Sequence, residues 1–203
     1  MGVLNDIGLK YDADKSSRFH NYLDFYEQHL PDRSFTGRLL EIGVMDGLSM
    51  KMWREYYPNA EIVGIDIKPM DHMYNSDWQV PESVKLITMD GTNSMQLKTL
   101  GMFDIIIDDG SHFMSHQQQS FDILYHRQLS KKGVYILEDL WTSHIKFYQD
   151  AKLTTIDYLK KLEKKGIKMT YFKYKHKGAG IETVFPEYKG LDSETVIIKG
   201  GQK

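Results

Sequence analysis

Two pairs of neighbouring carboxylates each follow directly on a short apolar run in this sequence. The first pair is Asp108 and Asp109, and the second is Glu138 and Asp139. Such runs are typical of buried strands in a parallel sheet, whose carboxyl ends gather the ligands of these folds. Carboxylates that meet there stay ionised only when a positive charge lies between them. The pattern therefore predicts a divalent cation with oxygen ligands.

A histidine stands close to the first pair. His112 follows Asp109 by three residues, at a turn into a predicted helix. An imidazole titrates near neutral pH, so His112 is a candidate general base, although it could also only cap or pack. Asp108 could face a bound ligand, hold the loop or cap the helix. His116 lies one helical turn further on, as a second metal ligand or as a solvent or substrate contact.

A second set of residues indicates a nucleoside ligand without phosphates. Glu41, Gly43 and Gly47 surround a turn between a strand and a helix, but the glycines do not match a dinucleotide or P-loop pattern. Asp66 ends the next strand about twenty residues on, where an acid commonly accepts hydrogen bonds from ribose hydroxyls. Asp90 ends the third strand, within reach of an adenine amine. The alternative is that the glycines only make a tight turn and Asp66 only caps a helix.

Strands and helices alternate from Arg38 onwards, which predicts right-handed crossovers and a parallel sheet. The last two strands lack a helix between them and should form a hairpin-like pair. We therefore expect a Rossmann-like, doubly wound α/β fold with a mostly parallel seven-stranded sheet and one antiparallel edge strand. The expected strands are Arg38–Val44, Glu61–Ile67, Val84–Met89, Phe103–Asp108, Gly133–Leu137, Met169–Tyr174 and Thr195–Lys199. The expected helices are Leu48–Tyr57, Ser94–Leu100, Phe113–Leu129 and Leu153–Lys165.

The remaining segments surround this core. Residues 1–35 are expected to be an N-terminal helical cap segment, with a helix from Ser16 or Ser17 to about Leu30, and residues 36–203 the core of a single domain. Asp14, Lys15, His20 and Tyr22 either form a polar cover over the acceptor or belong to a capped amphipathic helix that packs on the sheet. His144 either flanks the acceptor pocket or is a plain loop histidine. Residues 68–83 form a long connection, expected to be a lid or a packed surface loop.

Composition excludes several classes of protein. The chain has 203 residues, a formal net charge of −2 and no cysteine, so disulfides, thiolate metal sites and a cysteine nucleophile are ruled out. The charge predicts no nucleic-acid partner and no membrane partner. The sequence shows no signal peptide and no apolar stretch of transmembrane length. We expect a cytoplasmic protein.

The nucleoside pattern resembles that of class I S-adenosylmethionine-dependent methyltransferases. Glu41 to Gly47 is similar to the first motif of that family, Asp66 to its ribose-binding acid and Asp90 to its adenine-side acid. A narrower resemblance is to the metal-dependent sugar O-methyltransferases of macrolide biosynthesis, the mycinamicin type. It rests on the segments Asp108–His112 and Ile136–Asp139, and on Gly8–Lys15 with His20 and Tyr22 near the start of the chain.

This resemblance implies the roles of the site. Asp109, Glu138 and Asp139 would ligate Mg²⁺ or another divalent cation, His112 would be the base, and S-adenosylmethionine would be the methyl donor. The acceptor would be a small molecule, a sugar or sugar-containing natural product, and the protein a homo-oligomer. The macrolide enzymes carry an additional N-terminal domain, so their large acceptor is not carried over. Two rivals stay open. One is an iron(II) oxygenase of the cephalosporin-hydroxylase-like group, with His112, His116 and Asp109 as ligands, and the other is a non-catalytic nucleoside-binding module.

Overall fold

A seven-stranded sheet in the order β3-β2-β1-β4-β5-β7-β6 forms the centre of the protein. The computed structural model describes residues 2–68, 80–175 and 191–201. Strands β1 to β5 run parallel to one another, and β7 runs antiparallel to both of its neighbours. The strands are β1 (Arg38–Ile42), β2 (Glu61–Asp66), β3 (Val84–Thr88), β4 (Phe103–Asp108), β5 (Leu129–Leu137), β6 (Met169–Tyr174) and β7 (Ser193–Lys199).

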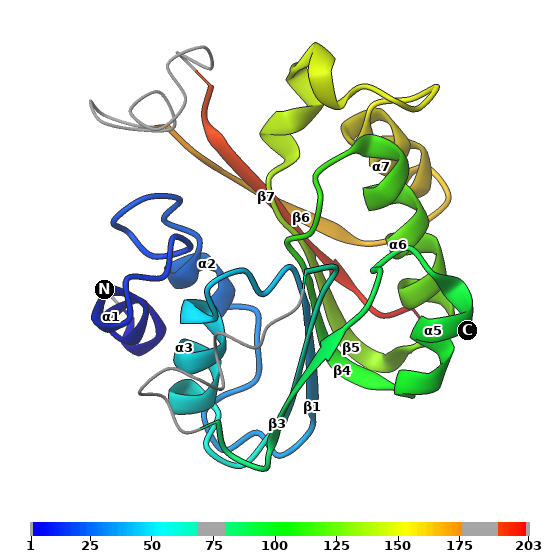
Figure 1. The fold of residues 1–203 in the computed structure, drawn as a ribbon. Helices are drawn as coiled ribbons and strands as arrows, with labels where there is room; N and C mark the ends of the chain where they lie inside the picture. Colours follow the sequence, from blue (N-terminus) through cyan, green and yellow to red (C-terminus); the bar gives the residue numbers. More distant parts are fainter. Residues whose placement is uncertain (1, 69–79, 176–190, 202–203) are drawn as a thin grey trace.

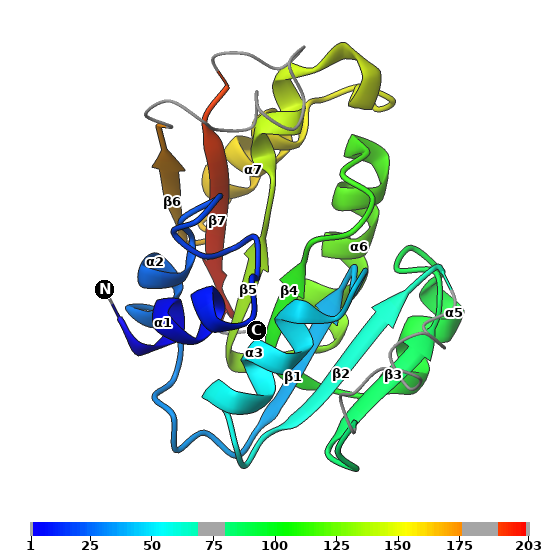
Figure 2. The ribbon, with the colours of Figure 1, turned by 60° about the vertical axis from the view of Figure 1, so that its left-hand side comes forward.

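Helices cover both faces of the sheet (Figures 1 and 2). One face carries α1 (Val3–Lys10), α2 (Leu23–Glu27) and α3 (Leu48–Tyr56), whose apolar side chains share a core with the sheet. The other face carries α5 (Ser94–Leu97), α6 (Met114–Arg127) and α7 (Thr155–Glu163) over a second core. Short 3₁₀ helices follow α5 at Lys98–Leu100, and follow β5 at Leu140–His144 and Lys146–Tyr148.

The predicted fold class is confirmed, and so is every predicted strand. The boundaries of β4 and β6 coincide with the predicted ones, and β5 begins earlier, at Leu129. The antiparallel strand lies one place further in than expected. Strand β7 pairs with β5 on one side and with β6 on the other, so β6 forms the edge.

The N-terminal segment differs from the expected single helix. Residues 3–10 form α1, residues 11–22 form turns, and only Leu23–Glu27 are helical within the stretch that we expected to run to Leu30. Asp12 and Asn21 have φ angles of 55° and 58°, and a left-handed residue interrupts a right-handed helix. The turn segment instead lies over the sheet, where Lys15, His20 and Tyr22 are buried. The division into a cap segment and a core stays a prediction.

Two further expectations concern surface features. Residues 69–79 of the long connection lie outside the described residues, and the expected lid or surface loop stays a prediction. Within the described ranges, the helices are too short or too polar to cross a membrane.

Candidate active site

Alternation along the strands places three acids on the same face of the sheet. Asp108 pairs with Ile42 on one side and with Leu137 on the other, so Asp109 and Glu138 continue neighbouring strands by one residue each. Successive side chains of a strand point to opposite faces. Asp109 and Glu138 therefore point to the face covered by the N-terminal segment, and Glu41 of β1 lies on that face as well.

A lysine of the N-terminal segment contacts all three acids. The Nζ atom of Lys15 lies 3.2 Å from Oε2 of Glu138 and 3.4 Å from Oε1 of Glu41, and it donates a short hydrogen bond to Oδ2 of Asp109. Its side chain is only 1% exposed. Burial lowers the pKa of the Lys15 ammonium, but the surrounding carboxylates, led by that of Asp109, more than offset burial and raise the pKa well above its usual value. Lys15 is therefore a permanent positive charge in this site.

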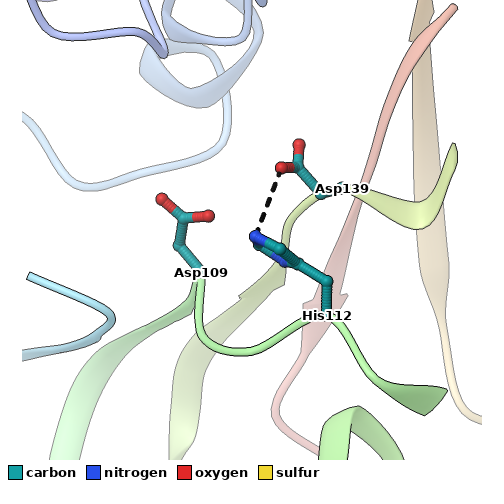
Figure 3. A group of neighbouring side chains, drawn as sticks. All are labelled: Asp109, His112 and Asp139. Atoms are coloured by element: carbon teal, nitrogen blue, oxygen red, sulfur yellow. Dashed lines mark ion pairs between the residues drawn. The ribbon is translucent and has the colours of Figure 1, made fainter. Parts of the chain in front are cut away.

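The loops after β4 and β5 bring Asp109, His112 and Asp139 together. Each residue offers one metal-ligating atom, and these atoms lie within 4.8 Å of one another. The side chains point toward a common space, with Nε2 of His112 lying 3.7 Å from Oδ2 of Asp139 (Figure 3). Within the part of the chain that the structure describes, this is the group of His and acidic residues suited to a metal ion. It contains two of the three predicted ligands and the predicted base.

Two residues of this group have an uncommon backbone conformation. His112 has a φ angle of 61° and Asp139 one of 53°. Left-handed backbone is uncommon for residues other than glycine, and such positions gather at functional sites. The surrounding structure holds these two side chains toward each other at some cost in backbone energy.

The carboxyl groups of the site differ in their protonation. Burial raises the pKa of Glu138 to about 8, although the Lys15 ammonium opposes this rise. Burial also raises the pKa of Asp109 well above its usual value. The pKa of Asp139 is lowered, because its burial is outweighed by His20, His112 and Lys15. Burial lowers the pKa of His20 itself, so Lys15 is the lasting positive charge near Asp139.

The residues present fit a divalent cation. Oε1 of Glu138 and Nδ1 of His112 are buried without a hydrogen-bond partner among the described residues. An orphaned buried polar atom carries a substantial desolvation cost, which a ligand relieves. Carboxylate oxygens are hard donors that Mg²⁺ and Ca²⁺ prefer. The donor set therefore suits such an ion. Asp109 and Asp139 belong to the metal-suited group, whereas Oε2 of Glu138 contacts the ammonium of Lys15.

His20 and Tyr22 lie against the acidic centre, by which we mean the group of Asp109, His112 and Asp139. The Tyr22 hydroxyl lies 3.0 Å from Oδ1 of Asp139 and 3.1 Å from the main-chain oxygen of Glu194. Nδ1 of His20 lies 2.7 Å from the Ser193 hydroxyl. Both side chains are buried, so they orient Asp139 and tie the N-terminal segment to β7. Contact with a substrate stays a prediction for both.

A cavity of about 680 Å³ adjoins the acidic centre at the carboxyl ends of the strands. This volume is in the usual range for a small-molecule site. Its walls include most of the predicted cofactor residues and two members of the acidic centre. These lining residues are Gly43, Asp66, Asp90, Asp108, Asp109 and His112.

The predicted ribose-binding and adenine-side acids both organise turns. Oδ2 of Asp66 accepts hydrogen bonds from the main-chain N–H groups of Val44 and Met45, each at 3.0 Å, and thereby holds the turn after β1. Oδ1 of Asp90 accepts from the main-chain N–H and the hydroxyl of Thr92, at 2.8 and 2.7 Å. Both acids line the cavity with their carboxylates fixed by these bonds.

The other predicted cofactor residues have different surroundings. Glu41 is fully buried and accepts a hydrogen bond from Nε1 of Trp53 at 2.9 Å, so its carboxylate belongs to the Lys15 cluster rather than to the cavity wall. Gly47 precedes α3 with a φ angle of 72°. Asp108 accepts hydrogen bonds from the hydroxyls of Tyr135, at 2.7 Å, and of Ser120, which favours its loop-holding role. Cofactor contacts for these residues stay predictions.

Two further histidines, His116 and His144, were predicted at the site. Nδ1 of His116 lies 2.6 Å from the Ser111 hydroxyl, and His116 lines the cavity. It is not part of the metal-suited group in the described residues. Nε2 of His144 lies 3.4 Å from Oε2 of Glu194, and the side chain is half-exposed. A role for His144 at the acceptor pocket stays a prediction.

Sequence reasoning missed the contacts of Lys15 and the Trp53 partner of Glu41. Lys15 is 94 positions from Asp109, and it lies in a segment without regular periodicity. One signal was present: Glu41 is an acid inside an apolar strand, and a buried carboxylate needs a donor or a cation.

Several solved structures have a similar fold, and a methyltransferase is among them. The MycE methyltransferase from the mycinamycin biosynthetic pathway, solved in complex with Mg, SAH and mycinamycin VI, matches 99% of this chain with a TM-score of 0.77 and 24% identity. The match covers 55% of that chain. The fibrillarin pre-rRNA processing protein of Methanococcus jannaschii matches 84% of this chain and 69% of its own, with a TM-score of 0.60 and 16% identity. The chain therefore has the Rossmann-like fold of class I methyltransferases.

The relatives found by sequence are named as O-methyltransferases of natural-product sugars. An 8-demethyl-8-(2-methoxy-α-L-rhamnosyl)-tetracenomycin-C 3′-O-methyltransferase of Streptomyces olivaceus is 32% identical over 164 residues, which cover 74% of this chain and 40% of that protein. The mycinamicin VI 2″-O-methyltransferase of Micromonospora griseorubida is 30% identical over 155 residues, or 70% of this chain and 37% of that protein.

The predicted resemblance to sugar O-methyltransferases is thus confirmed. The chain matches about two fifths of the length of these relatives. No family model matches the chain.

Proposed function

We propose that this chain is an S-adenosylmethionine-dependent O-methyltransferase that acts, with the help of a divalent cation, on a sugar hydroxyl of a natural product. The observation that carries the proposal is the meeting of Asp109, His112 and Asp139 within 4.8 Å, at the wall of the cavity. The relatives support it, since the proteins that the chain resembles are named for sugar O-methylation. The cavity would be the cofactor site of this methyltransferase, and the group of Asp109, His112 and Asp139 would be at its metal site.

The donor would occupy the cavity. Asp66 and Asp90 line it from the ends of β2 and β3, where hydroxyl and amine groups of a nucleoside would find carboxylate acceptors. The apolar side chains of Met45 and Ile67 also line the cavity and are 74% and 70% exposed, so they offer surface for a base to cover. The sulfonium would then face Asp109 and His112, which border the same cavity.

Methyl transfer requires the protein to align the acceptor hydroxyl with the methyl group and to remove the proton of that hydroxyl. The methyl group of a sulfonium is already activated, so the site must hold the acceptor oxygen in line with it. A sugar hydroxyl is a poor nucleophile, and His112 is placed to take its proton. Asp139 lies 3.7 Å from Nε2 of His112 and would stabilise the imidazolium that results.

Asp109, Glu138 and Asp139 would hold the cation. A bound Mg²⁺ would lower the pKa of the acceptor hydroxyl and fix its position. Oε1 of Glu138 is buried without a hydrogen-bond partner among the described residues and would be the ligand atom of this residue. Tyr22 keeps Asp139 in place through its hydroxyl, 3.0 Å from Oδ1.

Calorimetry and a transfer assay test this function. The protein should bind S-adenosylhomocysteine, and it should transfer a labelled methyl group from S-adenosylmethionine to a rhamnosyl or olivosyl glycoside. EDTA should abolish transfer, and added Mg²⁺ should restore it. Failure to bind S-adenosylhomocysteine, or full activity in EDTA, would overturn the proposal.

One observation speaks against the oxygenase rival. Its ligand set needs His116, but Nδ1 of that residue lies 2.6 Å from the Ser111 hydroxyl, outside the metal-suited group. A non-catalytic module would need no base, whereas His112 faces Asp139 across the centre. Oxygen uptake with Fe²⁺ and 2-oxoglutarate would revive the oxygenase assignment.

The proposal includes the setting of the enzyme. The acceptor is a small glycosylated molecule, and the enzyme is a cytoplasmic homo-oligomer without a nucleic-acid or membrane partner. The formal net charge of −2 supports the absence of polyanionic partners. Light scattering on the purified protein would measure the oligomeric state, and a monomer would remove that part of the proposal.

A further inference from the structure

Lys15 occupies a place where a lysine is costly. It belongs to the turn segment between α1 and α2, and its side chain is 1% exposed. Lysine is rarely fully buried unless its ammonium is paired. Here Nζ has Asp109, Glu138 and Glu41 around it, at the carboxyl ends of the three neighbouring strands β4, β5 and β1. The ammonium therefore joins three strands through their acids.

One lysine does not occupy all the ligand oxygens of this cluster. Four buried or largely buried acids meet here, namely Glu41, Asp109, Glu138 and Asp139. Nζ of Lys15 reaches both Asp109 and Glu138, while Oε1 of Glu138 stays without a hydrogen-bond partner among the described residues. The cluster thus keeps a free ligand atom after Lys15 has been satisfied.

We propose that Lys15 is a positioning residue that acts as an internal counter-cation. It holds the carboxylates together when no metal is bound, and it limits metal affinity by competing for Asp109 and Glu138. This inference rests on the divalent-cation site of the proposed function. A fixed ammonium beside a divalent ion repels that ion, and a contact at low dielectric has a strong effect. The site would therefore bind its ion weakly and reversibly.

Lys15→Met separates this role from ordinary structural support. The variant keeps the length of the apolar stem and removes the charge. In EDTA its melting temperature should fall, because buried carboxylates lose their cation. In Mg²⁺ it should recover, so the Mg²⁺-induced rise in melting temperature should exceed that of the unmodified protein. Calorimetry with Mg²⁺ alone should show affinity at least about tenfold tighter. A purely structural lysine predicts the same loss with and without metal.

Two further variants complete the comparison. Lys15→Arg keeps the charge and should keep the Mg²⁺ response of the unmodified protein. Lys10→Met makes the same change in the same segment at a side chain that is 57% exposed and paired with Glu55, so it should change neither the Mg²⁺ affinity nor the Mg²⁺-induced rise. A shift in the Lys10 variant equal to that of Lys15→Met would overturn the inference.

A double variant covers the case in which Lys15→Met does not fold. Lys15→Met with Glu41→Gln removes one charge of each sign, and Glu41 is outside the metal-suited group. Its Mg²⁺-induced rise in melting temperature should still exceed that of the unmodified protein, because Asp109 and Glu138 no longer share an ammonium. An equal or smaller rise would overturn the role of Lys15. If the unmodified protein binds no Mg²⁺, the proposed function fails as well. If it binds Mg²⁺ but the variant shows no larger rise, only the role of Lys15 fails.

Discussion

Gly43 and Asp109 approach each other through their backbones. A Cβ atom on Gly43 would lie 2.0 Å from the main-chain oxygen of Asp109, and Gly43 has a φ angle of 87°. The turn after β1, which borders the cavity, is thus packed directly on the loop that presents the first acid. The cofactor side and the acidic side of the site are joined by this contact, and it exists because residue 43 has no side chain.

Gly43→Ala should therefore be strongly destabilising. The left-handed backbone alone costs about 1–2 kcal/mol for alanine. The clash with the Asp109 backbone adds to this cost, so we expect a loss of more than about 3 kcal/mol in the free energy of unfolding. Gly166→Ala is the matched control, because φ is 95° there and a Cβ would meet no described atom within 4 Å. Urea unfolding that gives equal losses for both variants would contradict the close approach.

Asp66→Ala should weaken S-adenosylhomocysteine binding by at least about tenfold. The change removes the acceptor for the main-chain N–H groups of Val44 and Met45, and with it a proposed ribose contact. Asp66→Asn keeps one acceptor oxygen and should lose less. Calorimetry measures both, with the half-exposed Asp157→Asn as the control. Unchanged affinity in Asp66→Ala would place the nucleoside elsewhere.

Asp139→Asn should abolish metal-dependent chemistry while it preserves the fold. Asparagine tolerates the left-handed backbone of this position, where φ is 53°, and it has nearly the same shape. The loss of one charge should weaken Mg²⁺ binding by at least about tenfold and spare S-adenosylhomocysteine binding. Calorimetry with each ligand in turn checks this. Intact Mg²⁺ affinity would remove Asp139 from the ligand set.

His112→Asn distinguishes a base from a metal ligand. Asparagine again suits the left-handed backbone, with a φ angle of 61°. As the base, His112 is expected to contribute about 10²- to 10⁴-fold to the rate, with no effect on Mg²⁺ affinity. The transfer assay and Mg²⁺ calorimetry read the two properties separately. A fall in Mg²⁺ affinity as large as that of Asp139→Asn would make His112 a ligand instead.

The raised pKa of Glu138 predicts how stability varies with pH in EDTA. Burial raises this pKa from its usual value of 4.5 to about 8, so the folded protein binds a proton that the unfolded chain releases. The contribution is full below about pH 4.5 and is lost as the pH rises through about 8. The Glu138→Gln variant has no carboxyl group at this position and therefore does not lose this contribution as the pH rises. The melting temperature of the variant, relative to the unmodified protein, should therefore increase between pH 5 and pH 8, and a constant difference would contradict the raised pKa.

The sheet and most of the site were predictable because they depend on local patterns. Apolar runs that end in acids identify β4 and β5, and the period of two along a strand places Asp109 and Glu138 on one face. The acids after β2 and β3 follow from the order of elements. The strands needed no knowledge of distant contacts, which is why their predicted positions are confirmed.

The N-terminal segment was not predictable in the same way. Its aromatic spacing favours a helix, but Asp12 and Asn21 adopt left-handed backbone, and buried contacts with distant strands determine the path. The local sequence predicts Lys15 in a polar cover or in a capped helix, and it does not pair Lys15 with a buried acid. Only the three-dimensional placement of the acids gives it partners. Long-range contact overrides local propensity here.

The contacts between the N-terminal turn segment and β7 have a consequence for folding during translation. His20 meets Ser193 across 173 positions, and Tyr22 meets Glu194 across 172. A nascent polypeptide that ends before β7 already contains Lys15 and all the acids, but it lacks the partners that His20 and the Tyr22 hydroxyl find on that strand. The turn that carries Lys15 is therefore held by all of its partners only after the ribosome has delivered β7.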